Sequence, residues 1–532
     1  MWEWVKMLKP AMLFQDHMVL QREKPVAVWG TSRPNETVSV SIQGQTCSCK
    51  ADMEGRWCVK LPPLRTSFLE ILVISGASDV MTYQDVQVGD VWLASGQSNM
   101  EFFMRYDADF PEEKRVCSNA DIRFFDYPEV SYPEQIGEAD YGKNFGFWRK
   151  ACPEDLEWFS AVGYYFAKEI QGSYGIPVGI VGCNWGGTPA CAWMNEEEIR
   201  KGGGQVWIDE YKEGLKTLNL ENYEAQFRQN SPAWRTDPFQ DPFTDLLLQG
   251  ASLGEVVKKL TGQELDVSTI DMSVHAPTVG PKTETRPCGL YESMLCQVAP
   301  FTLRGILFYQ GESDGDRHPE VYATLFPALI QGFRDLWQEE LPFLFVQIAP
   351  FGRWMQSVGE PYVEIREAQQ LASERVPGTG MAVISDIGME LDIHPKKKQP
   401  VGHRLALLAE SKVYGDDVLC EAPTLVSAKE EGGALILRFT NTGDGLYIAD
   451  HTPDGVKTDP TKVGGLRVIE DGQVVNLDGV TASVEGETMT LCGDTLRIKK
   501  PFTVELGCTG WYRINLYNSA GLPARPSKVL VK

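Results

Sequence analysis

A strand-like apolar run that ends in a glycine turn and a serine constrains this chain more than any other feature. Residues 88–101 read Val-Gly-Asp-Val-Trp-Leu-Ala-Ser-Gly-Gln-Ser-Asn-Met-Glu. The apolar part predicts a buried strand, Gly96 predicts a tight turn, and the segment from Ser98 onward is able to start a helix. Open α/β sheets carry their chemistry at the carboxyl ends of strands. The pattern therefore predicts an α/β sheet that presents Ser98 as a nucleophile, provided that a histidine reaches it.

The patterns on either side divide the 532 residues into five parts. Residues 1–88 hold short β-branched runs between turn residues, which predicts an N-terminal β-sandwich domain. Strand and helix patterns alternate over 89–198 and 285–414, so these parts predict one catalytic domain with a parallel sheet covered by helices on both faces. The polar stretch 199–284 predicts an insertion in that domain. Residues 415–532 turn β again and predict a C-terminal β-sandwich domain.

Single elements follow from local periodicity and turn residues. Helices are predicted near 160–173, 211–216, 255–260 and 327–337, and strands near 26–30, 38–42, 69–74, 176–182, 305–309, 342–348, 380–384, 434–439, 490–492 and 511–517. The run Lys396–Lys398 is predicted to be a solvated approach to a helix that starts near Pro400. Aromatic residues of the insertion, Trp207, Tyr211, Tyr223 and Trp234, are expected either to pack or to stack on sugars.

Composition excludes several classes of partner. The formal net charge is -23, spread along the chain, which disfavours nucleic acid and anionic membranes. No apolar run reaches the ~18 residues of a membrane helix, and the first residues do not resemble a signal peptide. Twelve cysteines without a CxxC pair indicate mostly buried free thiols in a reducing compartment. We therefore expect a cytoplasmic protein with neither nucleic-acid nor membrane partners, and its oligomeric state stays open.

The base for Ser98 comes from a small set, because the chain has six histidines: His17, His275, His318, His394, His403 and His451. His394 is the best placed, since it follows a predicted strand in the segment Asp392-Ile393-His394. A carboxylate two residues away is able to hold the imidazole in one tautomer. His403 is predicted to lie on the following helix, in a packing or capping role.

A hydrolase also needs hydrogen-bond donors for an oxyanion. Asn184-Trp185-Gly186-Gly187-Thr188 follows the predicted strand 176–182, and paired glycines let backbone N–H groups approach a substrate. Gln310-Gly311-Glu312 follows the strand 305–309. Polar residues thus follow several strands at one side of the sheet. The chain has no HExxH, P-loop or GxGxxG motif, and no spacing singles out a metal site.

Taken together, these segments resemble the sialate O-acetylesterase family, a branch of the SGNH hydrolases. The resemblance rests on residues 14–22 (FQDHMVLQR), 89–100 (GDVWLASGQSNM), 184–188 (NWGGT), 289–294 (GLYESM), 309–313 (YQGES) and 392–395 (DIHP), whose order spans nearly 400 residues. It implies a flavodoxin-like SGNH core that removes acetyl groups from sugar hydroxyls without a cofactor or metal.

The resemblance also assigns roles to residues of this sequence. Ser98 is the implied nucleophile, His394 the base and Asp392 the acid that orients it. The Ser98 amide, an amide of Gly186 or Gly187, and the Gln310 side chain are the implied oxyanion donors. Gln97, Asn99 and Glu312 are expected to surround these groups.

Two departures from the SGNH pattern keep alternatives open. Gln310-Gly311-Glu312 replaces the asparagine block, and Leu391 occupies the position three residues before His394 where many SGNH enzymes have the acid. Asp386 or a Ser–His dyad is therefore the fallback to Asp392.

The predicted function is a serine esterase that deacetylates carbohydrates such as xylo-oligosaccharides or O-acetyl sialic acids. The alternatives are a non-catalytic carbohydrate-binding protein on a hydrolase scaffold and an SGNH hydrolase of lipids or thioesters.

Overall fold

The structure is a computed structural model that describes residues 8–77, 79–138, 141–229, 237–262, 279–493, 496 and 498–532. The chain divides into two compact units. The first contains residues 1–308 and 328–343, and the second contains residues 309–327 and 344–532. The predicted second part of the catalytic domain, 285–414, therefore contributes to both units.

The first unit begins with a series of β-strands, and burial alternates along three of them (37–42, 45–50 and 56–61), as expected for sheets with one covered face. The strands are β1 (Lys9–Pro10), β2 (Val19–Gln21), β3 (Val26–Thr31), β4 (Thr37–Ile42), β5 (Gln45–Lys50), β6 (Arg56–Leu61), β7 (Ser67–Ser75) and β8 (Val80–Gly96). One sheet has the order β1-β3-β6, while β4 pairs with β5 and β7, and β7 pairs with β8.

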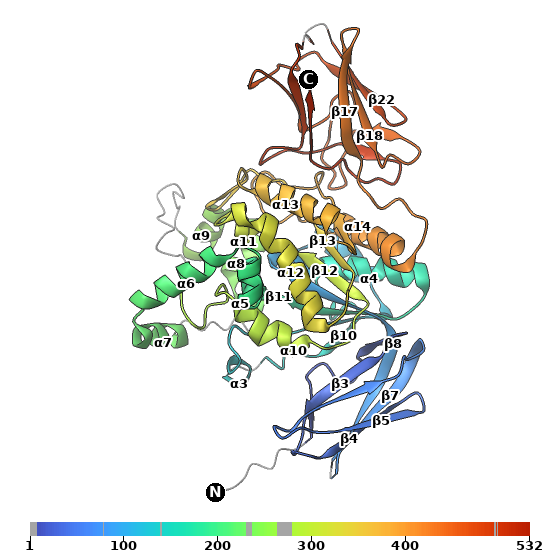
Figure 1. Ribbon diagram of the computed structural model, residues 1–532, viewed down its shortest axis with the longest axis vertical. Helices are drawn as coiled ribbons and strands as arrows, with labels where there is room; N and C mark the ends of the chain where they lie inside the picture. Colours follow the sequence, from blue (N-terminus) through green and yellow to red (C-terminus); the bar gives the residue numbers. More distant parts are fainter. Residues whose placement is uncertain are drawn as a thin grey trace. The chain divides into compact units, whose positions relative to one another are not determined.

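Strand β8 continues across the predicted domain boundary at residue 88 (Figure 1). Its first part pairs antiparallel with β7, and its second part pairs parallel with β11 (Val178–Asn184). Burial changes with the partner: residues 80–85 alternate between exposed and half-buried, whereas residues 86–96 are all buried. A strand covered on both faces reads as a continuous buried run. One strand thus belongs to both the N-terminal β region and the α/β sheet.

The α/β sheet of the first unit has the strand order β10-β9-β11-β8-β12. Its remaining strands are β9 (Asn119–Asp126), β10 (Trp148–Ala151) and β12 (Gly305–Tyr309). Strands β9, β11 and β8 are parallel, as predicted, but the edge strand β10 runs antiparallel to β9. The prediction of a parallel sheet does not hold at this edge, because the chain returns along it after the connection between β9 and β10, and β10 is not among the predicted strands. Helix α4 (Ala161–Tyr174) packs on the sheet, where the rings of Phe166 and Trp92 meet at 4.9 Å.

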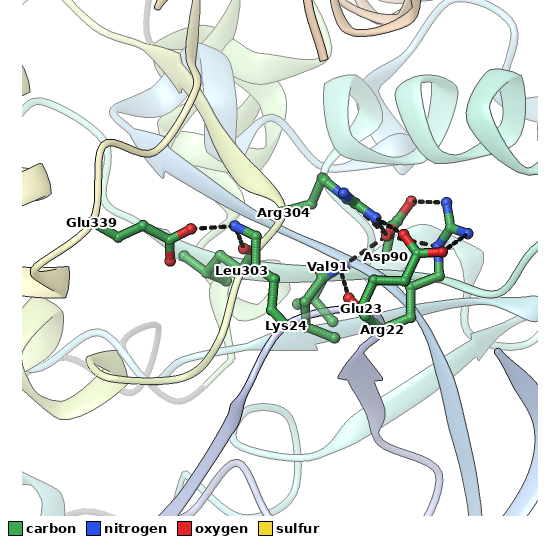
Figure 2. Close-up of polar contacts among 9 residues, drawn as sticks. Arg22, Glu23, Lys24, Asp90, Val91, Leu303, Arg304 and Glu339 are labelled. Atoms are coloured by element: carbon green, nitrogen blue, oxygen red, sulfur yellow. Dashed lines mark hydrogen bonds and ion pairs between the residues drawn. The ribbon is translucent and has the colours of Figure 1, made fainter. Parts of the chain in front are cut away.

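A buried carboxylate ties β2, β8 and the approach to β12 together (Figure 2). Asp90 is fully buried and accepts hydrogen bonds from Arg304 (2.8 and 2.9 Å), Arg22 (3.1 Å) and Gln21 (2.9 Å). Gln21 in turn accepts the Val91 amide at 2.9 Å. Two guanidinium groups satisfy the carboxylate, which is what a buried charge requires.

Several helices cover or extend the first unit. They are α1 (Ser98–Glu101), α2 (Phe110–Val116), α3 (Gln135–Glu138), α5 (Glu196–Lys201), α6 (Gln205–Thr217), α7 (Leu220–Gln229), α8 (Pro242–Leu248), α9 (Leu253–Thr261) and α10 (Cys296–Val298). Helices α6 to α9 lie in the predicted insertion 199–284, whereas its described end, residues 279–284, contains no helix. Trp207 and Tyr223 are buried and serve packing. Trp234 and His275 lie outside the described residues.

The second unit contains β13 (Phe343–Val346) from its second residue onward, β16 (Thr379–Ala382) and the helices α11 (Glu312–Gly315), α13 (Tyr362–Arg375) and α14 (Gln399–Ala409). Two antiparallel sheets follow, with the orders β17-β18-β23-β22 and β21-β20-β24-β26 (Figure 1). Their strands are β17 (Thr424–Glu431), β18 (Ala434–Thr440), β20 (Leu466–Glu470), β21 (Gln473–Val474), β22 (Thr481–Glu485), β23 (Thr488–Cys492), β24 (Phe502–Leu506) and β26 (Ser527–Val531). Leu437 of β18, Leu491 of β23 and Val504 of β24 share one apolar core.

Two predicted elements differ from the structure. Helix α12 (Tyr322–Trp337) begins five residues before the predicted start, and Pro327 lies inside it. Burial of apolar side chains such as Tyr322 and Phe326 outweighs the amide that proline lacks. The predicted strand 511–517 is wrong up to residue 515, since only β25 (Leu516–Asn518) forms. Arg513 instead donates to Asp454 (2.7 Å) and to the Gly388 carbonyl (2.7 Å).

The cysteines are less buried than predicted. All twelve are free thiols, but only Cys117, Cys183 and Cys191 are buried. The other nine lie partly or fully exposed, several of them on strands whose alternate faces meet solvent.

Candidate active site

Ser98 stands where the sequence predicts it, two residues past the end of β8 and at the start of the single-turn helix α1. Gly96 has a φ of 136°, which side chains rarely adopt. The Gln97 carbonyl accepts the amides of Met100 (2.8 Å) and Glu101 (3.0 Å) and so starts the helix. Ser98 is half-buried between buried neighbours. Ser98 is therefore partly exposed to solvent.

The loop after β11 lies against this serine. Strands β8 and β11 are in parallel register, with Gly96 opposite Asn184, so both loops leave the same edge of the sheet. A Cβ added to Gly186 would lie 3.2 Å from the Ser98 Cβ, which explains glycine at this close approach. Gly187 is exposed and has a φ of 74°. The structure thus brings Ser98 and Gly186 together, and Gly187 follows in the same loop.

Glu101, one helical turn after Ser98, holds the Gly186 amide. The Gly186 N–H donates to Glu101 Oε2 at 2.6 Å. Burial raises the pKa of Glu101, and this hydrogen bond opposes the rise. Burial also raises the pKa of Asp126 at the end of β9, the charge of Glu101 adds to that effect, and Arg149 opposes it. Two neighbouring carboxyl groups therefore resist ionising together.

Asp392 and His394 lie in the second unit, in the segment between β16 and α14. Asp392 Oδ1 accepts the His394 backbone amide at 2.8 Å and lies 3.3 Å from the imidazole Nδ1. Both residues are buried. Burial lowers the pKa of His394, and Asp392 offsets part of that change. The imidazole is consequently favoured in its neutral, basic form near neutral pH.

Lys396 is a further partner of this pair, contrary to the predicted solvated lysine run. Its Nζ lies 2.8 Å from Asp392 Oδ2, and its side chain is 16% exposed. Lys398 is fully buried, with its Nζ 5.3 Å from the centre of the Tyr309 ring. Burial would raise the pKa of Asp392, but the His394 hydrogen bond and the Lys396 charge outweigh it and lower that pKa. The lysines turn inward because Asp392 and an aromatic ring compensate their charges.

The fallback acid, Asp386, is engaged elsewhere in the second unit. Its carboxylate accepts two hydrogen bonds from Arg404, at 2.7 and 2.6 Å, and one from the Tyr517 hydroxyl at 3.2 Å. Such a bidentate pair fixes both partners. Between the two candidate acids, Asp392 is the one that reaches His394.

Gln310 and Glu312 also belong to the second unit and are buried. The Gln310 Nε2 donates to Asp314 at 2.5 Å, and its Oε1 accepts from the Tyr322 hydroxyl at 2.9 Å. The amide is thus held by partners of its own unit, and its role as an oxyanion donor stays a prediction. Glu312 begins helix α11.

Sequence reasoning missed Glu101 and Lys396. The spacing held a signal for each, because Glu101 is three residues after Ser98 on a helix, and Lys396 is four residues after Asp392. Both signals were weak, since each depends on the side chain turning inward. Among the described residues, no group of three or more His, Cys, Asp or Glu side chains could hold a metal ion. None of the helices in the described ranges is long and apolar enough to cross a bilayer.

Comparison with known proteins gives concordant results. Residues 281–408 match the family model described as carbohydrate esterase, sialic acid-specific acetylesterase. The chain is 27% identical to the sialate O-acetylesterase of Rattus norvegicus over 443 residues, which cover 76% of this chain and 73% of the relative. It is 24% identical to the sialate O-acetylesterase of Homo sapiens over 449 residues, covering 76% and 71% of the two chains.

A solved structure matches nearly the whole length. It is described as a novel carbohydrate acetylesterase from Xanthomonas citri, and it is 28% identical with a TM-score of 0.71. The match covers 98% of this chain and 99% of the other.

Proposed function

We propose that this chain, a carbohydrate O-acetylesterase by its relatives, is a serine esterase that uses Ser98, His394 and Asp392. The pairing of Asp392 with His394 carries the proposal. A carboxylate 3.3 Å from Nδ1 favours the tautomer whose Nε2 is the basic nitrogen. The esterase family supports an acetylated carbohydrate as the substrate.

The reaction proceeds in two acyl transfers. Nε2 of His394 takes the Ser98 proton while Oγ bonds to the acetyl carbonyl carbon, and the carbonyl π electrons move to oxygen. The tetrahedral intermediate then collapses, the sugar oxygen leaves with its bonding pair, and it takes the proton from His394. Water attacks the acetyl-serine in the same manner and releases acetate and free Ser98.

Backbone amides at the nucleophile turn stabilise the oxyanion. The Gly186 N–H is already committed to Glu101 at 2.6 Å. We therefore assign the two backbone donors to Ser98 and Gly187. The sequence alone does not distinguish Gly186 from Gly187 as the oxyanion donor. Each such donor contributes roughly 10²–10³ to the rate.

The finer features of the function belong to the same proposal. Xylo-oligosaccharides and O-acetyl sialic acids are the two candidate substrates. The regions before and after the α/β part are proposed as β-sandwich domains on an SGNH core. Alternate residues of β6 and β18 are buried, which supports sheets with one covered face.

Acetate release from acetylated xylo-oligosaccharides and 9-O-acetyl sialic acid, measured side by side, tests this function. Ser98→Ala and His394→Ala should each lower kcat/KM at least about 10³-fold, and Asp392→Asn about 10²–10⁴-fold. His451→Ala is the control, because this half-exposed histidine pairs with Asp450 far along the sequence from these residues.

Two results would contradict the proposal. Near-normal turnover by Ser98→Ala would remove the serine mechanism. A wild-type protein that binds acetylated sugars without releasing acetate would be a binding protein on a hydrolase scaffold.

A further inference from the structure

A short hairpin of the second unit brings an indole ring to His394. Strands β14 (Arg353–Trp354) and β15 (Ser357–Val358) pair antiparallel. The ring centroids of Trp354 and His394 are 5.0 Å apart, and the ring planes meet at 88°. Trp354 is half-buried. It therefore contacts the imidazole and is not fully covered by other protein atoms.

The hairpin is fixed to the segment that carries the base. The amides of Gly352 and Arg353 both donate to the Glu390 carbonyl at 2.9 Å, two residues before Asp392. At the other strand, Ser357 Oγ donates to Asp316 Oδ2 at 2.7 Å. Trp354 is held at both sides of its hairpin, so the ring is preorganised and costs little ordering on binding.

The proposed reaction decides what lies next to this ring. As general acid, His394 must approach the leaving sugar oxygen within about 2.6–3.2 Å. When the ester is on a ring hydroxyl, the carbon that bears this oxygen is itself part of the pyranose. The sugar ring must then lie immediately beside the imidazole, where Trp354 also lies. The C–H face of a pyranose is apolar and suits an aromatic surface.

We propose that Trp354 is a substrate-binding residue that packs against a pyranose acetylated on one of its ring hydroxyls. This inference rests on the proposed function and adds the position of the ester. In a 9-O-acetyl sialic acid the ester is on a side chain, and the ring is three carbons farther from the leaving oxygen. Trp354 therefore favours ring acetates over such exocyclic acetates.

The test compares three esters on Trp354→Ala, Trp354→Phe and the wild-type protein. They are an acetylated xylo-oligosaccharide with ring acetates, 9-O-acetyl sialic acid, and ethyl acetate, which has no sugar. Trp354→Ala should lower kcat/KM for the ring acetate about tenfold, chiefly through KM. For the other two esters, kcat/KM of Trp354→Ala should differ from wild type by less than about twofold. On the ring acetate, kcat/KM of Trp354→Phe should lie between those of the wild type and Trp354→Ala.

Val358→Ala is the matched control, since Val358 lies on the other strand of the same hairpin and is 43% exposed. This substitution should leave kcat/KM for all three esters unchanged. Circular dichroism melting of each variant shows whether the fold is kept, and Trp354→Phe keeps the test valid if Trp354→Ala does not fold.

Other outcomes overturn the inference. If Trp354→Ala lowers kcat/KM equally for all three esters, Trp354 only positions His394. If Trp354→Ala lowers kcat/KM equally for the two sugar esters, the preference for ring acetates is refuted. If it does not lower kcat/KM for either sugar ester, Trp354 does not bind the substrate. If the wild-type protein hydrolyses only the sialate ester, the inference fails while the esterase function stands. If Ser98→Ala stays active on ethyl acetate, the proposed function fails first.

Discussion

Removal of the Asp85 carboxylate should destabilise the first unit in a way that depends on pH. Asp85 lies in β8, and its carboxylate contacts Lys150 Nζ (2.5 Å), His17 Nδ1 (2.7 Å) and an Arg123 nitrogen (2.9 Å). Its side chain is 25% exposed, whereas that of Arg123 is 1% exposed. Asp85→Asn keeps the shape but leaves this buried guanidinium without its countercharge.

The size of the effect follows from the pKa. Burial alone would raise the pKa of Asp85, but hydrogen bonds from Lys150, His17 and Arg123 outweigh burial and lower it from 3.8 to about 2. One pKa unit is about 1.4 kcal/mol, so the ionised carboxylate stabilises the fold by about 2 kcal/mol at neutral pH. A depressed pKa means that this stabilisation is present above the unfolded pKa and is lost as pH falls toward the folded one. It should be nearly complete at about pH 5 and about half gone by about pH 3.

Urea denaturation followed by circular dichroism at pH 7, 5 and 3 measures the difference between Asp85→Asn and the wild-type protein. The chain has two units, so the comparison uses the midpoint of the transition that the substitution moves. Asp52→Asn is the control, because Asp52 also pairs with an arginine but at an exposed site, and it should move no midpoint. Equal midpoints for Asp85→Asn and the wild type at pH 7 would refute the reasoning. So would a difference that is as large at pH 3 as at pH 7.

Three further predictions concern the site. Lys396→Met removes a charge that lowers the pKa of His394, so the acid limb of the kcat/KM profile should move to higher pH, whereas Lys397→Met should leave it in place. An unshifted profile would show that Lys396 does not act on the base. Since burial raises the pKa of Glu101, its ionised form costs stability, and Glu101→Gln should raise the melting temperature at pH 8 but not at pH 4. A gain of the same size at both pH values would contradict this. Gly187→Ala forces a side chain onto a φ of 74° and should lower kcat at least tenfold at a folding cost of about 1–2 kcal/mol, and unchanged kcat would remove Gly187 from the oxyanion site.

Much of the fold could be predicted because local pattern and burial agree. The helix predicted at 160–173 forms as α4, with Ser160 as its cap and Gly175 at its end. Strand β11 falls within two residues of its prediction. The antiparallel edge strand β10 could not be predicted, since its direction depends on a loop and not on its own residues.

The candidate site could be predicted in part. Ser98 and the Asp392–His394 pair follow from strand ends and from sequence neighbourhood. The role of Glu101 could not be predicted from the sequence, because a carboxylate in the first turn of a helix is normally solvated. Only the close approach of the Gly186 loop buries it. The cytoplasmic location, the lack of nucleic-acid and membrane partners and the predicted domain limits remain predictions.

Because β8 is continuous from Val80 to Gly96, the N-terminal β region and the α/β sheet cannot be separated at residue 88 without cutting a strand. The strand that delivers Ser98 is hydrogen-bonded to the N-terminal β region through residues 80–88 and to the α/β sheet from residue 90 onward. Excision of residues 1–88 would cut it in mid-strand and expose the backbone of a buried segment to unwanted pairing. The N-terminal region is therefore not a separate domain that could be exchanged without cutting β8. Because it pairs with the strand that carries the nucleophile, its removal should also destabilise the α/β sheet.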